Sequence, residues 1–165
     1  MNMLIDSHHH LWNYSAEQYG WINDEMKVLR RNFGTADLKQ ISDKNGVNGF
    51  VSVQARQSLE ETDALLDMAR DEPLIRGVVG WVPLCAADLD ATLDRYSQMP
   101  LLKGVRHVVQ DEPDDRFLLR DDFNRGIRML ANRNLVYDVL IYGRQLPAAI
   151  EFVEMHPDQP MVLAH

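Results

Sequence analysis

Short segments rich in β-branched and other apolar residues alternate with amphipathic segments along most of this 165-residue sequence. The apolar segments have the length of strands, and the segments between them repeat apolar residues at helical spacing. Successive strand candidates begin about thirty residues apart, which is the spacing of a strand–helix unit in a (β/α)8 barrel. The six strand candidates are residues 4–10, 47–55, 75–84, 101–110, 135–141 and 160–164. This alternation predicts a parallel sheet with helices outside it.

Capping residues indicate where the helices between these strands begin and end. Thr35 predicts the start of one helix, and Asn45 with Gly46 predicts its end. Ser58 and Glu61 have the spacing of a capping box and open the next helix. The expected helices are residues 35–45, 58–69, 88–96, 122–132 and 145–156, and residues 13–31 are expected to form a long loop.

Two architectures are compatible with this order, an open doubly wound sheet and a (β/α)8 barrel. A dinucleotide-binding sheet requires a glycine-rich turn after its first strand, and here that turn carries histidines. A barrel places its chemistry at the C-terminal ends of its strands, where His8, His10 and His165 lie. A complete barrel takes about 250 residues. We therefore expect residues 1–165 to form one partial TIM-barrel domain of the α/β class, with about six of its eight β/α units.

Three consecutive histidines, His8 to His10, end the first strand candidate. Because side chains alternate along a strand, Asp6, His8 and His10 should share one face, and Ser7 and His9 the other. Two imidazoles two residues apart can bind one metal ion or polarise one carbonyl. A tag remnant, a pair of core histidines and a solvated loop are the alternatives, and the pair alone does not decide between them.

The net charge and the cysteine content restrict the partners and the compartment. A formal net charge of -8 and a pI near 5.1 argue against binding to nucleic acid or to an anionic membrane, which requires clustered Lys and Arg. No apolar run is long enough to span a bilayer. Cys85 is the single cysteine, so no intramolecular disulfide forms, and the cytoplasm is the expected compartment.

Two further histidines need an interpretation. Arg106 and His107 are neighbours in the fourth strand candidate, so only one of them can face the barrel interior, and the pattern alone does not decide which. His156 stands at a helix end before Pro157, where a cation favours the helix dipole.

Several motifs together resemble the amidohydrolase-related (amidohydrolase 2) family, and its sugar-lactone and dicarboxylate-lactone hydrolase branch in particular. The resemblance covers the whole length in the same order. The motifs are Asp6 to Trp12, Val51 to Ala55 with Ser58 to Thr62, Val78 to Val82, Lys103 to His107 and Val162 to His165. The resemblance implies a (β/α)8 barrel that hydrolyses a small lactone.

The resemblance also implies roles for individual residues. His8 and His10 would be the strand-one pair and His165 the strand-six histidine, all three catalytic and all three possible ligands of a single metal site. Arg106 would bind a substrate carboxylate or hydroxyl, because its guanidinium donates two parallel hydrogen bonds. Tyr142 and Trp12 are further candidate substrate contacts.

Two departures from the family pattern restrict the chemistry. The family's catalytic aspartate belongs to strand eight, which this sequence does not contain. Neither a lysine late in the fourth strand candidate nor a histidine in residues 135–141 is present to hold a second metal. We therefore expect one divalent metal ion, zinc before others, or none.

Three functions remain open at this point. The first is hydrolysis of a sugar-acid lactone or a pyrone-dicarboxylate lactone, with the histidines polarising the carbonyl directly or through one metal ion. The second is a carbon–carbon lyase, because metal-dependent decarboxylases share the barrel and the histidine pair. The third is an inactive truncated barrel that forms homo-oligomers through its two open sheet edges.

Overall fold

A single sheet of six parallel strands forms the centre of the protein, and the strands follow one another in the sheet in sequence order. The structure is a computed structural model, and it describes residues 3–164. The strands are Ile5–His9 (β1), Gly49–Val53 (β2), Ile75–Gly80 (β3), Leu102–Val108 (β4), Val136–Leu140 (β5) and Met161–Leu163 (β6). Each strand pairs in parallel with the next, so β1 and β6 form the two outer edges.

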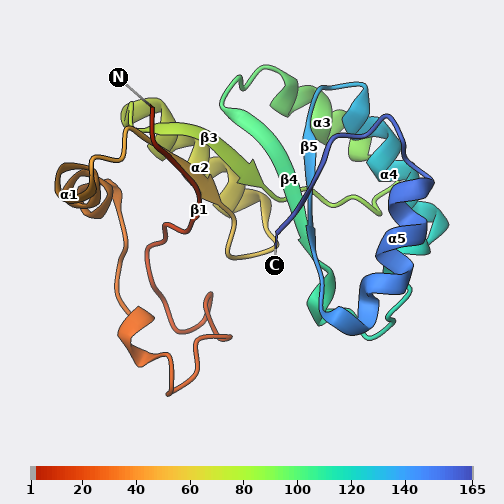
Figure 1. The fold of residues 1–165 in the computed structure, drawn as a ribbon, viewed down its shortest axis with the longest axis horizontal. Helices are drawn as coiled ribbons and strands as arrows, with labels where there is room; N and C mark the ends of the chain where they lie inside the picture. Colours follow the sequence, from red (N-terminus) through yellow and green to blue (C-terminus); the bar gives the residue numbers. More distant parts are fainter. Residues whose placement is uncertain (1–2, 165) are drawn as a thin grey trace.

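Each connection between successive strands carries an α-helix. Within the described part of the chain these are Thr35–Asn45 (α1), Leu59–Asp71 (α2), Leu89–Ser97 (α3), Asp121–Ala131 (α4) and Leu146–Glu154 (α5). Short 3₁₀ turns occupy Lys27–Leu29, Val109–Asp111, Phe117–Leu119 and Gly143–Gln145. The helices lie on the outer side of the curved sheet, and its concave side is open (Figure 1). The architecture is therefore a partial TIM barrel of six strands with a helix in each connection, as the alternation predicts.

The main hydrophobic core lies between the sheet and the helices. Tyr137 on β5 is fully buried and meets Phe123 of α4 edge to face, with ring centroids 5.8 Å apart. Phe152 of α5 contacts the same tyrosine ring at 5.8 Å. Because side chains alternate along β5, Val136 and Asp138 point to the opposite, concave side. The same alternation therefore produces both the core and the lining of the interior.

A second, smaller cluster holds the long loop between β1 and α1. Trp12, Tyr19 and Ile22 are buried together, with Phe33 packed against them. Trp12 and Phe33 also form an antiparallel bridge through both of their backbone amides. The loop is therefore fixed beside the C-terminal end of β1, where the histidines lie.

The observed helix ends differ from the expected ones where another residue provides the cap. Gly34, and not Thr35, is the N-cap of α1, because the Asp37 carboxylate accepts the Gly34 amide hydrogen bond at 2.9 Å. At α2 the Ser58 hydroxyl accepts from the Glu61 amide, as expected. The Glu61 carboxylate does not complete the capping box, because it accepts hydrogen bonds from elsewhere.

The strands are shorter than the apolar runs that predict them. The run starting at Ile75 was expected to continue to residue 84, but β3 ends at Gly80, because the Trp81 amide donates to the Thr62 hydroxyl at 2.8 Å instead of to a neighbouring strand. No helix within residues 3–164 has the length and apolarity needed to cross a membrane.

Candidate functional site at the C-terminal end of the strands

A bulge in β1 places two successive side chains on the concave side of the sheet. Asp6 pairs with Phe50 and His9 with Ser52, so β1 contains one residue more than β2 over this stretch. As a result Ser7 and His8 both line the interior cavity. The expectation that Ser7 lies on the face opposite His8 is therefore wrong, since strict alternation does not continue through a bulge.

His10 contacts His8 just beyond the end of β1. Their rings meet edge to face with centroids 5.1 Å apart. The Nδ1 atom of His10 lies 2.8 Å from the Val53 carbonyl oxygen. A carbonyl only accepts, so Nδ1 carries the proton and Nε2 is left unprotonated. Burial, and after it the charge of Arg106, lowers the pKa of His10 to about 4, so the ring is neutral at pH 7.

His9 faces the helices, away from the cavity. Its Nε2 atom lies 3.0 Å from the Ser52 hydroxyl, and its ring meets the buried ring of Phe50 edge to face at 5.3 Å. Burial lowers the pKa of His9 to about 4. The three consecutive histidines are thus a pair beside the interior and one side chain in the core.

Arg106 on β4 contacts both His8 on β1 and Gln54, the residue after β2. It is 4% exposed, and its Nη1 lies 3.3 Å from His8 Nε2. Because a guanidinium only donates, His8 Nε2 is the acceptor in this contact. Arg106 Nη2 donates to the backbone carbonyl of Gln54. The side-chain amide of Gln54 in turn donates to the backbone carbonyl of Arg106 at 3.2 Å. Arg106 is therefore held by β1 and β2 simultaneously.

His107, the neighbour of Arg106, packs on the outer side of the sheet. Its ring stacks on Phe117 with centroids 5.0 Å apart and an interplanar angle of 7°. Its Nε2 atom lies 2.7 Å from a carboxylate oxygen of Glu112. Of the two neighbours on β4, the arginine is thus the one that reaches the histidine pair.

Asp138 on β5 is a polar residue of the interior that the sequence analysis missed. It pairs in register with Arg106 and is 6% exposed. Burial raises the pKa of its carboxyl group, and the nearby charge of Arg106 opposes that change. A single acidic residue inside the apolar run Val136–Leu140, at a position whose neighbours alternate, is the signal that could have identified it.

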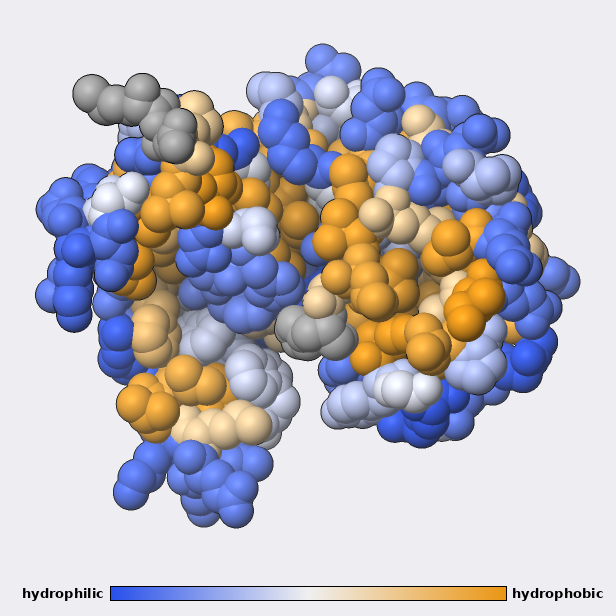
Figure 2. Space-filling model, in the orientation of Figure 1, coloured by the Kyte–Doolittle hydropathy of each residue, from blue (hydrophilic) through white to orange (hydrophobic). Residues whose placement is uncertain are grey.

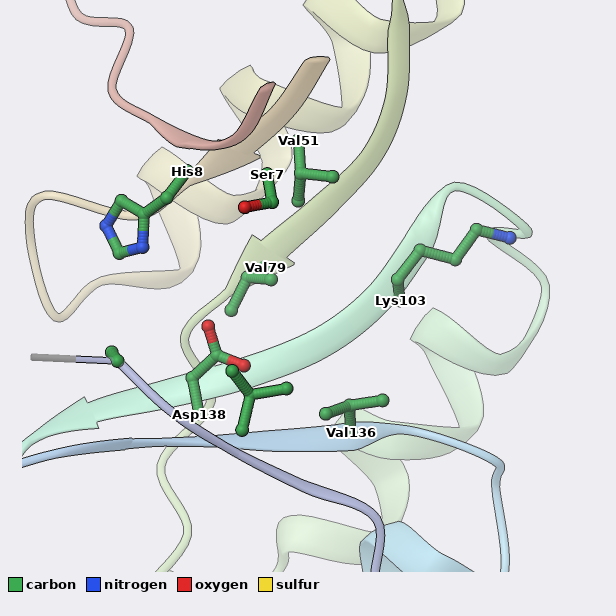
Figure 3. A pocket seen from close by; sticks show the side chains of 9 residues that line it. Ser7, His8, Val51, Val79, Lys103, Val136 and Asp138 are labelled. Carbon is green, nitrogen blue, oxygen red and sulfur yellow. The ribbon is translucent and has the colours of Figure 1, made fainter. Parts of the chain in front are cut away.

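The cavity on the concave side has a volume of about 400 Å3 and two chemically different ends. Figure 3 shows Ser7 and His8 on one wall and the Asp138 carboxylate pointing into the cavity from the other. Aliphatic side chains line the rest of the interior, among them Val51, Val79 and Val136. Polar groups therefore gather at the end of the interior where enzymes with this fold place their reactions.

The remaining expected site residues lie apart from this cluster. Trp12 is buried and donates its indole hydrogen to the Arg31 carbonyl at 2.9 Å. Its ring stacks on His10 with centroids 6.4 Å apart, so it packs against the histidine ring. Tyr142 is 48% exposed next to Arg144 and does not line the cavity. His165, expected to be the third histidine, lies outside the described residues.

The ring nitrogens of His8 and His10 fit part of a single zinc site. His10 has the arrangement of a zinc ligand, because a backbone carbonyl fixes its Nδ1 proton and leaves Nε2 as the donor. The Nε2 atom of His8 faces the guanidinium of Arg106. A catalytic zinc needs three protein ligands. Residues 3–164 contain no group of three or more His, Cys, Asp or Glu side chains that could hold a metal ion.

Comparison with known families identifies residues 5–165 with the amidohydrolase model. The chain belongs to the amidohydrolase family. This confirms the family that the sequence motifs resemble.

Two relatives carry the same name. The chain is 40% identical over 164 residues to the L-fucono-1,5-lactonase of Burkholderia multivorans, a match that covers 99% of this chain and 55% of the relative. It is 30% identical to the L-fucono-1,5-lactonase of Burkholderia ambifaria, covering 100% of this chain and 57% of the relative. The chain thus spans a little more than half the length of these relatives.

Solved structures show the same fold. An amidohydrolase from Burkholderia multivorans, crystallised with bound zinc, superposes with a TM-score of 0.93 at 38% identity, covering 98% of this chain and 57% of that one. The 2,6-dihydroxybenzoate decarboxylase from Rhizobium superposes with a TM-score of 0.64 at 12% identity, covering 98% and 65%. The decarboxylase match is a likeness of fold alone.

Proposed function

We propose that the protein hydrolyses a sugar-acid 1,5-lactone. The observation that carries this proposal is the contact between Arg106 and His8 at the cavity, in a chain that is 40% identical to a protein named L-fucono-1,5-lactonase. The decarboxylases resemble this chain only in fold, so nothing comparable supports their reaction. Residues 1–165 would supply one partial barrel domain of this enzyme, and the activity requires that the natural protein also contain the C-terminal part with the base of strand eight.

Lactone hydrolysis requires an electrophile on the carbonyl oxygen, an activated water and a proton for the leaving oxygen. Arg106 supplies a fixed positive charge, and its contacts with His8 and Gln54 leave further N–H donors for a substrate oxygen. His10 supplies a neutral imidazole with an unprotonated Nε2, which can accept a hydrogen bond from the attacking water. In this proposal His8, His10 and His165 are the catalytic histidines, and the base expected on an eighth strand is not among the residues of this chain.

A single zinc ion fits the proposal as a cofactor. The zinc-bound relative of known structure and the orientation of His10 support it. His8 and His10, together with His165, would hold the ion, and His10 Nε2 would then bind the metal instead of accepting a hydrogen bond from water. When bound, it would polarise the lactone carbonyl as a Lewis acid.

The remaining parts of the proposal concern partners and compartment. Arg106 is proposed to contact the lactone directly, and Trp12 to act through His10. For Tyr142, which does not line the cavity, substrate contact remains a prediction from the sequence. We also propose that the protein works in the cytoplasm, because a chain with Cys85 as its single cysteine suits a reducing compartment.

Substitution of His10 tests the assignment. We expect His10→Ala to lower kcat/KM for L-fucono-1,5-lactone by about a hundredfold or more, the effect of losing an acid–base or electrostatic group. His9→Gln is the matched control, because His9 faces the helices and glutamine retains a polar partner for Ser52. Steady-state kinetics on both variants, after circular dichroism has shown that they fold, gives the comparison. Equal kcat/KM in His10→Ala and wild type would contradict the site.

A further inference from the structure

The Asp138 carboxylate is buried and yet accepts no hydrogen bond from any residue within 3–164. It is 6% exposed and points into the cavity (Figure 3). Glu61 shows how this chain satisfies a buried carboxylate, because at 3% exposure it accepts from the Ala55 and Arg56 amides and the Tyr19 hydroxyl. An ionised carboxylate without hydrogen bonds is costly in an apolar setting. The acceptor sites of Asp138 are therefore available to a ligand in the cavity.

Asp138 and Arg106 form a donor and acceptor pair that suits hydroxyl groups. They occupy paired positions on β5 and β4. A carboxylate only accepts hydrogen bonds and a guanidinium only donates them, whereas a hydroxyl does both. Neighbouring hydroxyls on one ring can therefore donate to Asp138 and accept from Arg106.

We propose that Asp138 is a specificity-determining residue that accepts hydrogen bonds from the ring hydroxyls of a sugar lactone. This inference rests on the proposed lactonase function and specifies its substrate class.

Kinetics on two lactones with the same ring test the inference. A six-carbon aldono-1,5-lactone carries hydroxyls, and δ-valerolactone has none. We expect Asp138→Val to reduce kcat/KM on the aldonolactone about tenfold or more, mainly through KM, since a hydrogen bond to a charged group is lost. The kcat/KM of Asp138→Val for δ-valerolactone should differ from that of wild type by less than about twofold. The kcat/KM of Asp138→Asn on the aldonolactone should lie between those of wild type and Asp138→Val, because asparagine keeps one acceptor oxygen.

Asp158→Asn is the matched control, because it removes a carboxylate from an exposed turn outside the cavity. Equal losses on both lactones in Asp138→Val would overturn the inference, since a base or a merely structural residue would affect both. Unchanged kinetics on both lactones would overturn it as well.

A binding measurement separates failure of this inference from failure of the lactonase proposal. A 1,5-anhydroalditol has the ring and hydroxyls of the sugar but no carbonyl, so calorimetry reports recognition without hydrolysis. We expect wild type and Asp158→Asn to bind it alike and Asp138→Val to bind about tenfold more weakly. Wild type that binds this ligand but hydrolyses neither lactone would refute the lactonase proposal alone. Absent binding, or an equal Kd in Asp138→Val, would refute the role of Asp138.

Discussion

Arg106 determines the geometry of the polar cluster, because it is the residue that joins three strands of the sheet. Its guanidinium reaches His8 on β1 and the carbonyl of Gln54 after β2, and its own strand pairs with the strand of Asp138. Planar, fixed donors of this kind suit recognition of oxygen atoms, and the paired oxygens of a carboxylate or phosphate above all. The positions of His8 and Asp138 relative to the substrate therefore depend on one side chain.

At the same scale, His156 differs from its interpretation as a helix-end cation. It is buried, and its Nε2 donates to the Asn124 side-chain oxygen at 2.6 Å. The Asn124 amide is already used by the carbonyls of Leu118 and Arg120, which fixes its oxygen as the acceptor. Burial lowers the pKa of His156 from 6.5, with Arg128 adding to the effect. In the folded chain this histidine is neutral.

This burial predicts a pH dependence of stability. The unfolded chain binds a proton at His156 below pH 6.5 more readily than the folded chain does. The stabilisation is thus complete above that pH and decreases as the pH falls toward the lower pKa of the folded state. Urea unfolding between about pH 7.5 and about pH 5.5 should show a larger loss of unfolding free energy in wild type than in His156→Gln, which cannot titrate. An equal loss of unfolding free energy in wild type and His156→Gln over this pH range would contradict a neutral, buried His156.

Sequence patterns predicted the residues of the interior only where the alternation is regular. Period two separates His9 from His8 and His10, whereas it places Ser7 on the wrong face, because the β1 bulge adds a residue without a composition signal. Arg106 was chosen over its neighbour through the family resemblance. Asp138 was missed because a polar residue in an apolar strand has no periodicity of its own.

At the scale of elements, the number, type and order of strands and helices follow from the sequence, and their ends do not. The apolar run from Ile75 continues past the point where β3 ends, because tertiary contacts decide where the ladder stops. The start of α1 likewise depends on the Asp37 side chain reaching back to Gly34. Both interactions involve particular atoms that no propensity describes.

Gly126 provides an element-scale prediction, since it lies where α4 meets the loop after β3. A Cβ atom at this position would overlap the backbone carbonyl of Leu84. Alanine normally stabilises a helix relative to glycine, by about 1 kcal/mol. Here we expect Gly126→Ala to destabilise the protein by about 1–3 kcal/mol, because backbone cannot move aside as a flexible side chain can. Thermal or urea unfolding gives the measurement.

The control for this substitution is Gly143→Ala. Its Cβ would meet nothing within 4 Å, so the unfolding free energy should stay within about 0.5 kcal/mol of wild type. If Gly126→Ala raised the unfolding free energy, the close approach of α4 to the Leu84 backbone would be contradicted.

At the scale of the whole molecule, the sheet presents an apolar edge. Ile150 and Val153 of α5 are 55% and 46% exposed, and Leu163 of β6 is 65% exposed. Figure 2 shows hydrophobic side chains gathered over this side of the molecule. β6 is an outer strand of the sheet, and unpaired edges with apolar cover favour association with another chain.

We therefore expect the isolated 165-residue chain to self-associate with increasing concentration. Combining Ile150→Lys with Leu163→Lys should reduce this association, because charges on an edge oppose pairing. Light scattering coupled to size-exclusion chromatography at several concentrations measures it. Val28→Lys is the control, since Val28 is 75% exposed but lies in the β1–α1 loop. A monomeric wild-type chain at every concentration would contradict this prediction and the proposed homo-oligomer.

The sequence order of the strands also has a consequence for the folding of the chain. Within residues 3–164 each strand pairs only with strands adjacent in sequence, so each β/α unit can dock on the preceding one as soon as it is synthesised. The polar cluster is different, because His8 and Arg106 are 98 residues apart. During synthesis the scaffold can therefore grow unit by unit, whereas the contact between Arg106 and His8 forms only when the fourth strand joins the first three, and Asp138 follows with the fifth.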